Sequence, residues 1–300
     1  MSTRHPVPVH IAGLMFFIAF AWGSSWPVMK VVLTELAPMH FRLICLVIGV
    51  LGLFAISWAG GQRIRLPAGS GLPLLGISLC NLGAWNILAP HGVLMIGAGR
   101  AAILCYTFPV WTALLGRWFL KEELTPRRVM GVSLGLFAVL LLLGSDIQAV
   151  GRSPLGAVLL IAVAIGWAAS LVMMKKWPID LPSSSFTAWQ ALITMVPVGL
   201  FALFFEEGSF SPAGLTIWPL LALVYSIFIF IFCNWAWTKI AVTVSPAVSS
   251  LSVLFNPVIA VFTSALLIDE QPQWADYAAL VLVVCAMATV LLPSAKQARA

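Results

Sequence analysis

The chain has little charge for its length: of its 300 residues, 9% are Asp, Glu, Lys or Arg, whereas 61% are hydrophobic. A soluble domain carries about a quarter charged residues, so this composition excludes an ordinary soluble protein. A disordered chain and a nucleic-acid-binding domain are excluded as well, because both need a polar composition. We therefore expect no nucleic acid as a partner, and we predict an integral membrane protein surrounded by the lipid bilayer.

Cysteine and histidine are scarce and scattered. The five cysteines (Cys45, Cys80, Cys105, Cys233 and Cys285) lie within apolar runs and form no C-x-x-C pair, which argues against a disulfide framework and a metal site. The four histidines (His5, His10, His40 and His91) lie near the ends of apolar runs. An enzyme needs a clustered nucleophile and base, a metal set or a phosphate-binding loop. We expect no enzymatic activity, no cofactor and no metal, and an integral membrane enzyme is the alternative from another class.

Long apolar runs dominate the chain. A membrane-spanning helix needs about 20 mostly apolar residues. Ten runs meet this requirement, at residues 10–31, 37–58, 71–90, 97–119, 128–145, 155–175, 184–205, 215–237, 244–267 and 275–293. The sequence predicts an all-α integral membrane protein with ten transmembrane helices. Because ten helices are enough to enclose a pathway, we expect the monomer to be functional.

Basic residues predict how the chain is oriented. With a cytoplasmic N-terminus, twelve Lys and Arg residues fall on the cytoplasmic side, and Lys30 and Arg152 fall on the other. The positive-inside rule then places both termini in the cytoplasm. The first run also resembles a signal peptide with a cleavage site at residues 19–21. Since the apolar run continues beyond that point, we expect the first helix to be retained.

The sequence contains an internal repeat. Residues 22–30 and 167–175, at an offset of 145, share Trp, Ser, Met and Lys at matching positions. Two further segments, 109–122 and 257–270, both begin with Pro and end with Glu thirteen residues later. Several non-aliphatic matches in the same order are not expected from apolar composition alone. We interpret them as the trace of two repeated units.

The repeat divides the chain into residues 1–148 and 149–300, with five predicted helices in each part. Because five is odd, the second part enters the membrane with the opposite orientation, so the repeats are inverted. Transporters with inverted repeats expose a central site to the two sides of the membrane in turn. The repeat therefore predicts alternating access.

These motifs resemble a known group of transporters. Three features carry the resemblance: the Trp-x-x-Ser segments with a following Lys, Pro38 with Arg42 at the start of the second run, and the two Pro-x₁₂-Glu segments. With these features the chain resembles the drug/metabolite transporter superfamily, and more closely two tandem EamA-type domains. The resemblance implies multi-pass insertion in a bacterial inner membrane and export of small metabolites, often amino acids. The tryptophan-rich first helix is similar to YddG-type amino-acid exporters. Thr187 stands where the second repeat would match Arg42, so the resemblance implies no symmetric role for that arginine.

Aromatic and polar residues inside the apolar runs are candidates for substrate binding, because polar groups in hydrocarbon are costly and usually face a cavity or another helix. Trp22, Ser25 and Trp26 share one face of the first helix, and Trp167 and Ser170 repeat that face in the sixth. They predict opposed aromatic walls of a central pocket. The alternative is that the rings only fill an interface between helices.

Amides and hydroxyls extend the candidate site. The further candidates are Asn81, Trp85 and Asn86 in the third run, Tyr106 in the fourth, and Ser252 and Asn256 in the ninth. An amide is able to hold an ammonium or a carboxylate without carrying a net charge. The alternatives are close packing through small residues and hydrogen bonds between helices, which are worth about 0.6 kcal/mol each.

Prolines and arginines within the runs suggest further roles. Pro27, Pro109 and Pro257 are predicted to kink gating helices. Arg42 and Arg100 lie in the outer halves of their helices, where snorkelling to the lipid headgroups is common. An arginine that turned inward would instead attract a substrate carboxylate.

All ten acidic residues fall in loops or at helix ends, so the sequence offers no intramembrane carboxylate for exchange of a proton or sodium ion. We expect a facilitative carrier, or one coupled weakly through His91 or Glu270. An uncharged pocket of rings, amides and hydroxyls suits a zwitterion with an apolar side chain, such as Phe, Met or Thr. The alternative substrates are drugs, sugars, nucleotide sugars and lipid-linked metabolites.

Overall fold

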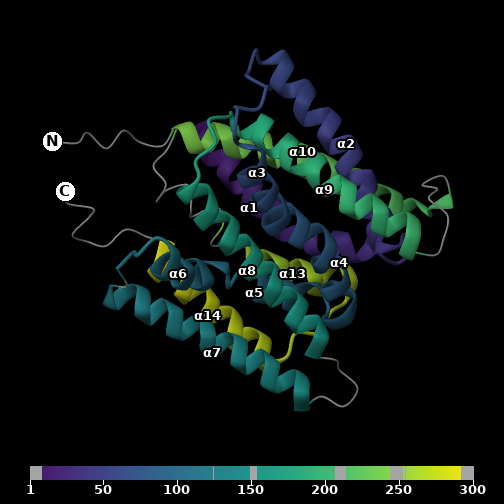
Figure 1. Cartoon of the computed structure of the whole chain (residues 1–300). Helices are drawn as coiled ribbons and strands as arrows, with labels where there is room; N and C mark the ends of the chain where they lie inside the picture. The colour runs from purple at the N-terminus through teal and green to yellow at the C-terminus, as the bar shows by residue number, and fades with distance from the viewer. Residues whose placement is uncertain are drawn as a thin grey trace.

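The computed structural model describes residues 9–123, 125–148, 154–206, 214–243, 253 and 255–291, and these residues contain helices and no strand. Eight helical segments among them are long and apolar enough to cross a membrane, and two further apolar helices are shorter. The predicted all-helical membrane fold is therefore confirmed for this part of the chain. Figure 1 shows the helices crossing one another in a single bundle.

The first half begins with two long helices and continues with segments that are interrupted. Its elements are α1 (Val9–Val32), α2 (Pro38–Ala59), α3 (Gly71–Ser78), the π-helix η1 (Leu79–Gly83), α4 (Ala84–Ile96), α5 (Ala98–Cys105), α6 (Phe108–Phe119) and α7 (Pro126–Gln148). Because α3, η1 and α4 follow one another directly, the third apolar run is helical to Ile96, six residues beyond the predicted end. The fourth run, predicted as one helix over 97–119, is divided between α5 and α6.

The second half has fewer interruptions. Its described elements are α8 (Pro154–Lys176), α9 (Ser183–Phe205), α10 (Ile217–Thr243), α13 (Asn256–Ile268) and α14 (Trp274–Leu291). The predicted ninth run began at residue 244, and α13 is the helix within it whose bounds are described. Ser252 lies outside the described residues.

Proline chemistry explains the division of the fourth run. A proline inside a helix loses one hydrogen bond, and its ring clashes with the carbonyl four residues earlier, which for Pro109 belongs to Cys105. Helix α5 ends at that cysteine, and Pro109 falls in the first turn of α6, where proline is favoured. Pro257 likewise occupies the first turn of α13, whereas Pro27 lies inside the uninterrupted α1.

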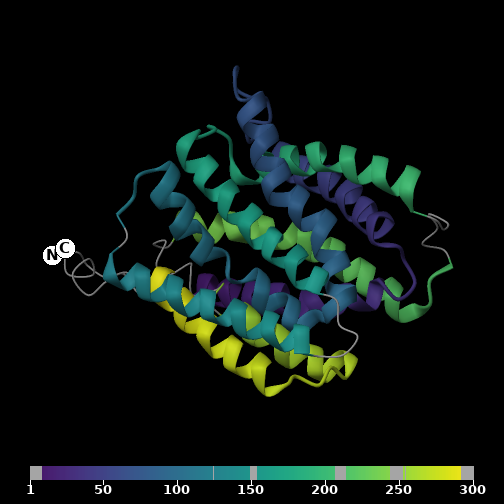
Figure 2. The same ribbon diagram turned by 60° about the horizontal axis from the view of Figure 1, so that its bottom comes forward.

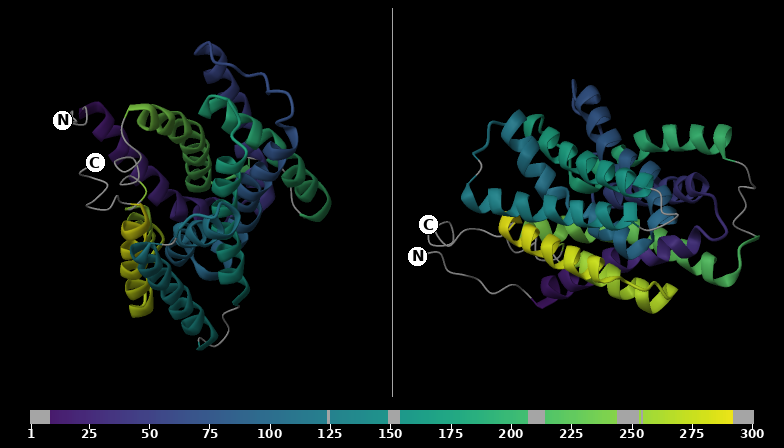
Figure 3. Two further views of the ribbon diagram at one scale, coloured as in Figure 1. Left: turned by 60° about the vertical axis from the view of Figure 1, so that its left-hand side comes forward. Right: turned by 90° about the horizontal axis from the view of Figure 1, so that it is seen from below.

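Helices of the two halves interlock. Helix α1 packs against α10 and α13 of the second half, and α8 packs against α4 and α6 of the first. Helices α2 and α9 form a third pair, and α7 and α14 a fourth that lies along one edge of the bundle in Figures 1 and 2. Figure 3 shows that α7 and α14 stay side by side when the bundle is viewed from below. The contacts of one half therefore have counterparts in the other.

Large apolar side chains also cover the outside of the bundle. Phe204, Phe205 and Leu266 have 74%, 75% and 83% of their surface exposed. A soluble monomer rarely exposes apolar patches on this scale, whereas lipid tails solvate them without cost. This surface fits insertion in a bilayer.

A close approach of α1 and α13 leads to the first test. A Cβ atom added at Gly23 would lie 2.6 Å from the Cβ of Ile259 and 3.0 Å from the carbonyl oxygen of Asn256. We expect Gly23→Ala to lower the free energy of unfolding by about 1–3 kcal/mol, because the helices must move apart. Thermal unfolding in detergent micelles measures this loss. Gly13→Ala is the matched control, since its added Cβ meets nothing within 4 Å; equal melting temperatures of the two variants would contradict the prediction.

Candidate functional site

Five aromatic side chains meet in the interior, and we call them the aromatic cluster: Trp26, Trp85, Tyr106, Phe108 and Trp167. The Trp26 ring centroid lies 5.1 Å from that of Trp85 and 6.5 Å from that of Tyr106. The Trp167 ring stacks on Phe108 at 4.1 Å and lies 6.2 Å from Trp85 and 6.3 Å from Tyr106. The sequence predicted four of these five rings as site residues, and the structure brings those four together.

The cluster draws on both halves of the chain. Trp26 comes from α1, Trp85 from α4, Tyr106 from the break between α5 and α6, and Trp167 from α8. Trp26 and Tyr106 are buried, with 1% and 3% exposed surface, whereas Trp85 and Trp167 are partly exposed. These two rings are therefore the members of the cluster with the most accessible surface. The helix break before Pro109 is what places Tyr106 and Phe108 here.

Polar groups border the rings. The side-chain amide of Asn256, the first residue of α13, donates a hydrogen bond of 2.8 Å to the hydroxyl oxygen of Tyr106. The buried indole nitrogen of Trp26 lies near the Tyr106 hydroxyl without a hydrogen bond of full geometry to any described residue. An indole N–H is a donor only, so it suits an acceptor on a ligand. The cluster thus combines apolar faces with uncharged polar groups.

Five of the predicted site residues make contacts other than those between the rings of the aromatic cluster. The Trp22 ring lies 5.8 Å from that of Trp237, and the Asn81 amide donates a hydrogen bond of 3.1 Å to Gln190. Asn86, Ser25 and Ser170 donate to backbone carbonyls of their own helical segments, those of Leu82 at 2.8 Å, Trp22 at 2.7 Å and Trp167 at 2.7 Å. Ser252, the remaining candidate, lies outside the described residues. Asn81 lies in the π-helix η1, and its amide joins this segment to α9. Gln190 and Trp237 are therefore neighbours that the candidate list lacked.

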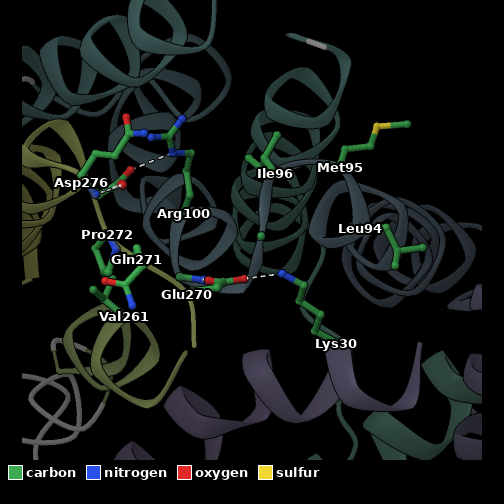
Figure 4. A pocket seen from close by; sticks show the side chains of 13 residues that line it. Lys30, Leu94, Met95, Ile96, Arg100, Val261, Glu270, Gln271, Pro272 and Asp276 are labelled. Carbon is green, nitrogen blue, oxygen red and sulfur yellow. Dashed lines mark hydrogen bonds and ion pairs between the residues drawn. The ribbon is translucent and has the colours of Figure 1, made fainter. Parts of the chain in front are cut away.

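A cavity of about 300 Å³ opens at the end of α1 that carries Lys30. We call this the Lys30 end. Its lining includes the charged residues Lys30, Arg100, Glu270 and Asp276, as Figure 4 shows. The ammonium of Lys30 in α1 lies 2.7 Å from the Glu270 carboxylate, which follows α13. An ion pair at this end therefore joins the two halves of the chain.

Glu270 also binds the beginning of α5. Its two carboxylate oxygens accept hydrogen bonds from the backbone nitrogens of Ala98 at 2.8 Å and Gly99 at 3.0 Å. Gly97, just before the helix, has φ +90°, a conformation that favours glycine. Burial raises the pKa of Glu270, but the hydrogen bonds from Lys30, Gly99 and Ala98 outweigh it and hold the pKa below its ordinary value.

A second ion pair lies at the same end. The Nε of Arg100 donates a hydrogen bond of 2.7 Å to Asp276 of α14, and both side chains are buried. The other carboxylate oxygen of Asp276 accepts a bond of 2.7 Å from the backbone nitrogen of Gln273. Arg100, predicted to snorkel or to attract a substrate, is instead paired inside the protein.

A comparable ion pair lies at the opposite end of the bundle. Gly156 at the start of α8 touches Ile96 beside the cavity, and Lys175 follows nineteen residues later, about 28 Å along the helix axis. Lys175 pairs with Glu122, which also accepts a hydrogen bond of 2.9 Å from Arg128. We call this the Lys175 end. The bonds from Lys175 and Arg128 lower the pKa of Glu122 despite its partial burial.

The two lysine–glutamate pairs cross between the repeats. Lys30 and Lys175 are matched residues of the sequence repeat, as are Glu122 and Glu270. In the structure Lys30 of the first half binds Glu270 of the second, and Lys175 of the second half binds Glu122 of the first. The sequence repeat contained this signal, because both lysines and both glutamates were already matched; what it lacked was their pairing.

The comparisons with known proteins agree with this architecture. The EamA-like transporter family matches residues 11–144 and again 154–292. The uncharacterized transporter YoaV of Bacillus subtilis is 26% identical over 85% of this chain and 87% of its own. A protein of Escherichia coli named "probable amino-acid metabolite efflux pump" is 25% identical over 90% of this chain and 91% of its own.

A solved structure supports the same fold. A crystal structure with a TM-score of 0.65 is 21% identical in sequence and covers 95% of this chain and 98% of its own chain. This likeness concerns the arrangement of the helices alone. With a family match that spans nearly the whole chain, this multi-pass membrane protein belongs to the EamA-like transporter family.

Proposed function

We propose that the protein is a secondary transporter that exports amino acids, or similar small zwitterionic metabolites, across the inner membrane. The substrate moves down its own gradient by alternating access, and one chain is sufficient. The observation that carries this proposal is the aromatic cluster at the junction of both halves, with the Asn256–Tyr106 hydrogen bond at its side. Rings suit the apolar part of the substrate, and uncharged polar groups suit its ends.

The proposal includes ten membrane-spanning helices in two inverted repeats, with both termini in the cytoplasm. The shorter helices α13 and α14 belong to the ninth and tenth spans. The Lys30 end then faces outward and the Lys175 end faces the cytoplasm. The matching helix contacts of the two halves and the crossed ion pairs support this arrangement, because an inverted repeat generates the same interaction once at each end.

Counterflow in liposomes tests the proposed function. Purified protein is placed in liposomes preloaded with unlabelled amino acids, and uptake of labelled Phe, Met and Thr is measured against protein-free liposomes. We expect uptake of at least one of them, because unlabelled substrate inside drives exchange through a carrier. If no amino acid is taken up, the amino-acid assignment is wrong, and drugs, sugars and lipid-linked metabolites remain to be tested.

The same assay tests coupling to protons. The lowered pKa of Glu270 keeps its carboxylate ionised. The ion pair with Lys30 therefore persists at neutral pH and is lost only as the pH falls below the ordinary glutamate range. His91, the other residue considered for coupling, contacts the Ile87 carbonyl of its own helix at 2.7 Å. We expect counterflow to change less than about twofold between about pH 5.5 and pH 8. A rate that follows the titration of a histidine, near about pH 6.5, would contradict this expectation.

A further inference from the structure

Arg42, in the first turns of α2, has no counter-ion among the residues that the structure describes. Its Nη2 lies 2.6 Å from the sulfur of Met29, and its guanidinium carbon lies 4.6 Å from the centroid of the Phe41 ring. The Nε atom is buried and has no hydrogen-bond partner within the described residues, while the residue as a whole is half-buried. Within the described part of the chain Arg42 forms no ion pair, in contrast to Arg100, which is bound to Asp276.

Such an arrangement is costly for the protein alone. A guanidinium stays protonated under all physiological conditions, so it cannot relieve its burial by losing a proton. Buried charges are normally paired, and one that lacks a partner inside a membrane protein is a sign of function. The neighbours of Arg42 include the Met29 thioether, the Phe41 ring and the Cys45 thiol, and none of them is an acidic partner for its charge.

The position of Arg42 connects it with the aromatic cluster. Met29 follows Trp26 by three residues in α1, which corresponds to about 4.5 Å along the helix axis. The indole N–H of Trp26 is buried beside the Tyr106 hydroxyl, but no hydrogen bond between them has full geometry. One short stretch of α1 therefore adjoins the unpaired Arg42 Nε and a weakly bonded indole N–H. A ligand that supplies acceptor oxygens would satisfy both.

We propose that Arg42 binds the carboxylate of the transported substrate while the apolar part of the substrate lies against the aromatic cluster. This inference rests on the proposed function and deepens it. An arginine presents two parallel N–H donors that match the two oxygens of a carboxylate. An ammonium group on the same substrate is then close enough to the ring faces for cation–π contact. The substrate class is thereby narrowed to organic acids with an apolar side chain.

The second repeat has no arginine at the position that matches Arg42. Thr187 of α9 stands at the repeat position that matches Arg42, so the second half offers no equivalent guanidinium. A substrate therefore binds with one orientation, its carboxylate towards the α1–α2 side. Amides and amines of the same shape lack the negative charge and are expected to bind weakly.

Binding of three matched compounds tests the proposal. Calorimetry in lipid nanodiscs compares L-phenylalanine, its amide and 3-phenylpropionate on the wild type, Arg42→Gln, Arg42→Lys and the control Arg117→Gln. Arg117 is an exposed arginine of α6, so the control removes the same charge elsewhere. We expect the wild type and the control to bind phenylalanine at least about tenfold more tightly than the amide. Arg42→Gln should bind both equally, and Arg42→Lys should keep part of the preference.

The outcomes separate this inference from the proposed function. Binding of 3-phenylpropionate without binding of phenylalanine, together with no counterflow of Phe, Met or Thr, would support the carboxylate site and contradict amino-acid transport. Equal wild-type affinity for phenylalanine and its amide, or an unchanged preference in Arg42→Gln, would overturn the carboxylate site alone. Binding of none of the three compounds would overturn the carboxylate site, and counterflow of Phe, Met and Thr decides the proposed function separately. Thermal unfolding shows whether each variant is folded. If Arg42→Gln does not fold, Arg42→Lys serves in its place: a preference for phenylalanine over its amide as large as that of the wild type would overturn the site.

Discussion

Replacement of Trp167 by alanine is expected to reduce counterflow of the substrate by about tenfold to a hundredfold. This ring touches Phe108, Trp85 and Tyr106, and it is one of the two partly exposed rings of the aromatic cluster. Aromatic contacts contribute about 0.5–1.5 kcal/mol each beyond the area they bury. Removing the indole therefore takes away a wall of the proposed site and loosens the other rings.

Three controls distinguish loss of binding from loss of folding. Trp118→Ala removes a tryptophan that is 77% exposed at the end of α6, and it should leave counterflow unchanged. Trp167→Phe keeps a ring against Phe108 and should retain most of the activity. Asn81→Ala removes only a hydrogen bond to Gln190, worth about 0.6 kcal/mol, and should have a small effect. If Trp167→Ala transports like the wild type at equal expression, the aromatic cluster is not the substrate site.

The helical character of the chain could be predicted because hydrophobicity alone determines which segments enter a bilayer. The interruption of the helix at Tyr106 was harder to predict from the sequence. Pro109 indicated a disturbance of the helix, but a kink within one helix and a division into α5 and α6 fit the same residue. The end of α4 at Ile96 depends on Gly97, whose positive φ allows the next helix to begin in a new direction. Local sequence marks such points without specifying their geometry.

The candidate site could be predicted where residue type restricts the environment. Large aromatic rings within apolar runs pack in few environments. Trp85 packs against both Trp26 and Trp167 in the structure. Small polar residues gave a weaker signal, because a serine hydroxyl reaches a carbonyl of its own helix, as Ser25 and Ser170 do. Which helix faces which is decided by tertiary packing, so the partner of an amide could not be read from helical spacing.

We expect Glu270→Gln to shift the transporter towards a conformation that is open at the Lys30 end. The change removes the ion pair with Lys30, whose two side chains are 34% and 19% exposed, and places an amide against the N–H groups of Ala98 and Gly99. A partly exposed pair contributes about 1 kcal/mol at most, and a carboxylate at a helix N-terminus about 0.3–1 kcal/mol. A combined loss of about 1–2 kcal/mol corresponds to a population shift of about fivefold to thirtyfold.

Labelling of a cysteine in the cavity wall measures this shift. Val261 lines the cavity and is 1% exposed, so Val261→Cys reacts with a membrane-impermeant maleimide only when α13 moves away from α5. Serine replaces the two native cysteines that are not buried, Cys80 and Cys285, to lower the background. We expect faster labelling with Glu270→Gln. An unchanged labelling rate would mean that the carboxylate does not hold this end closed.

Glu122, the matched residue at the Lys175 end, provides a control that is expected to change the labelling rate in the opposite direction. Glu122→Gln removes the pairing with Lys175 and Arg128, so it favours opening of the Lys175 end. If the two ends open in turn, the Lys30 end must then be closed more of the time, and labelling of Val261→Cys becomes slower. Faster labelling in both variants would indicate general loosening of the bundle and would contradict alternating access.

Exchanging the two charges separates the ion pair from the helix end. Lys30→Glu combined with Glu270→Lys restores the attraction between α1 and the segment after α13, but it directs an ammonium at the N-terminus of α5, which prefers negative charge. Labelling of Val261→Cys should therefore return only part of the way to the wild-type rate. Full recovery would assign the closure to the Lys30–Glu270 attraction, and no recovery would assign it to the bonds of Glu270 with Ala98 and Gly99. Partial recovery is expected because the carboxylate makes both interactions at once.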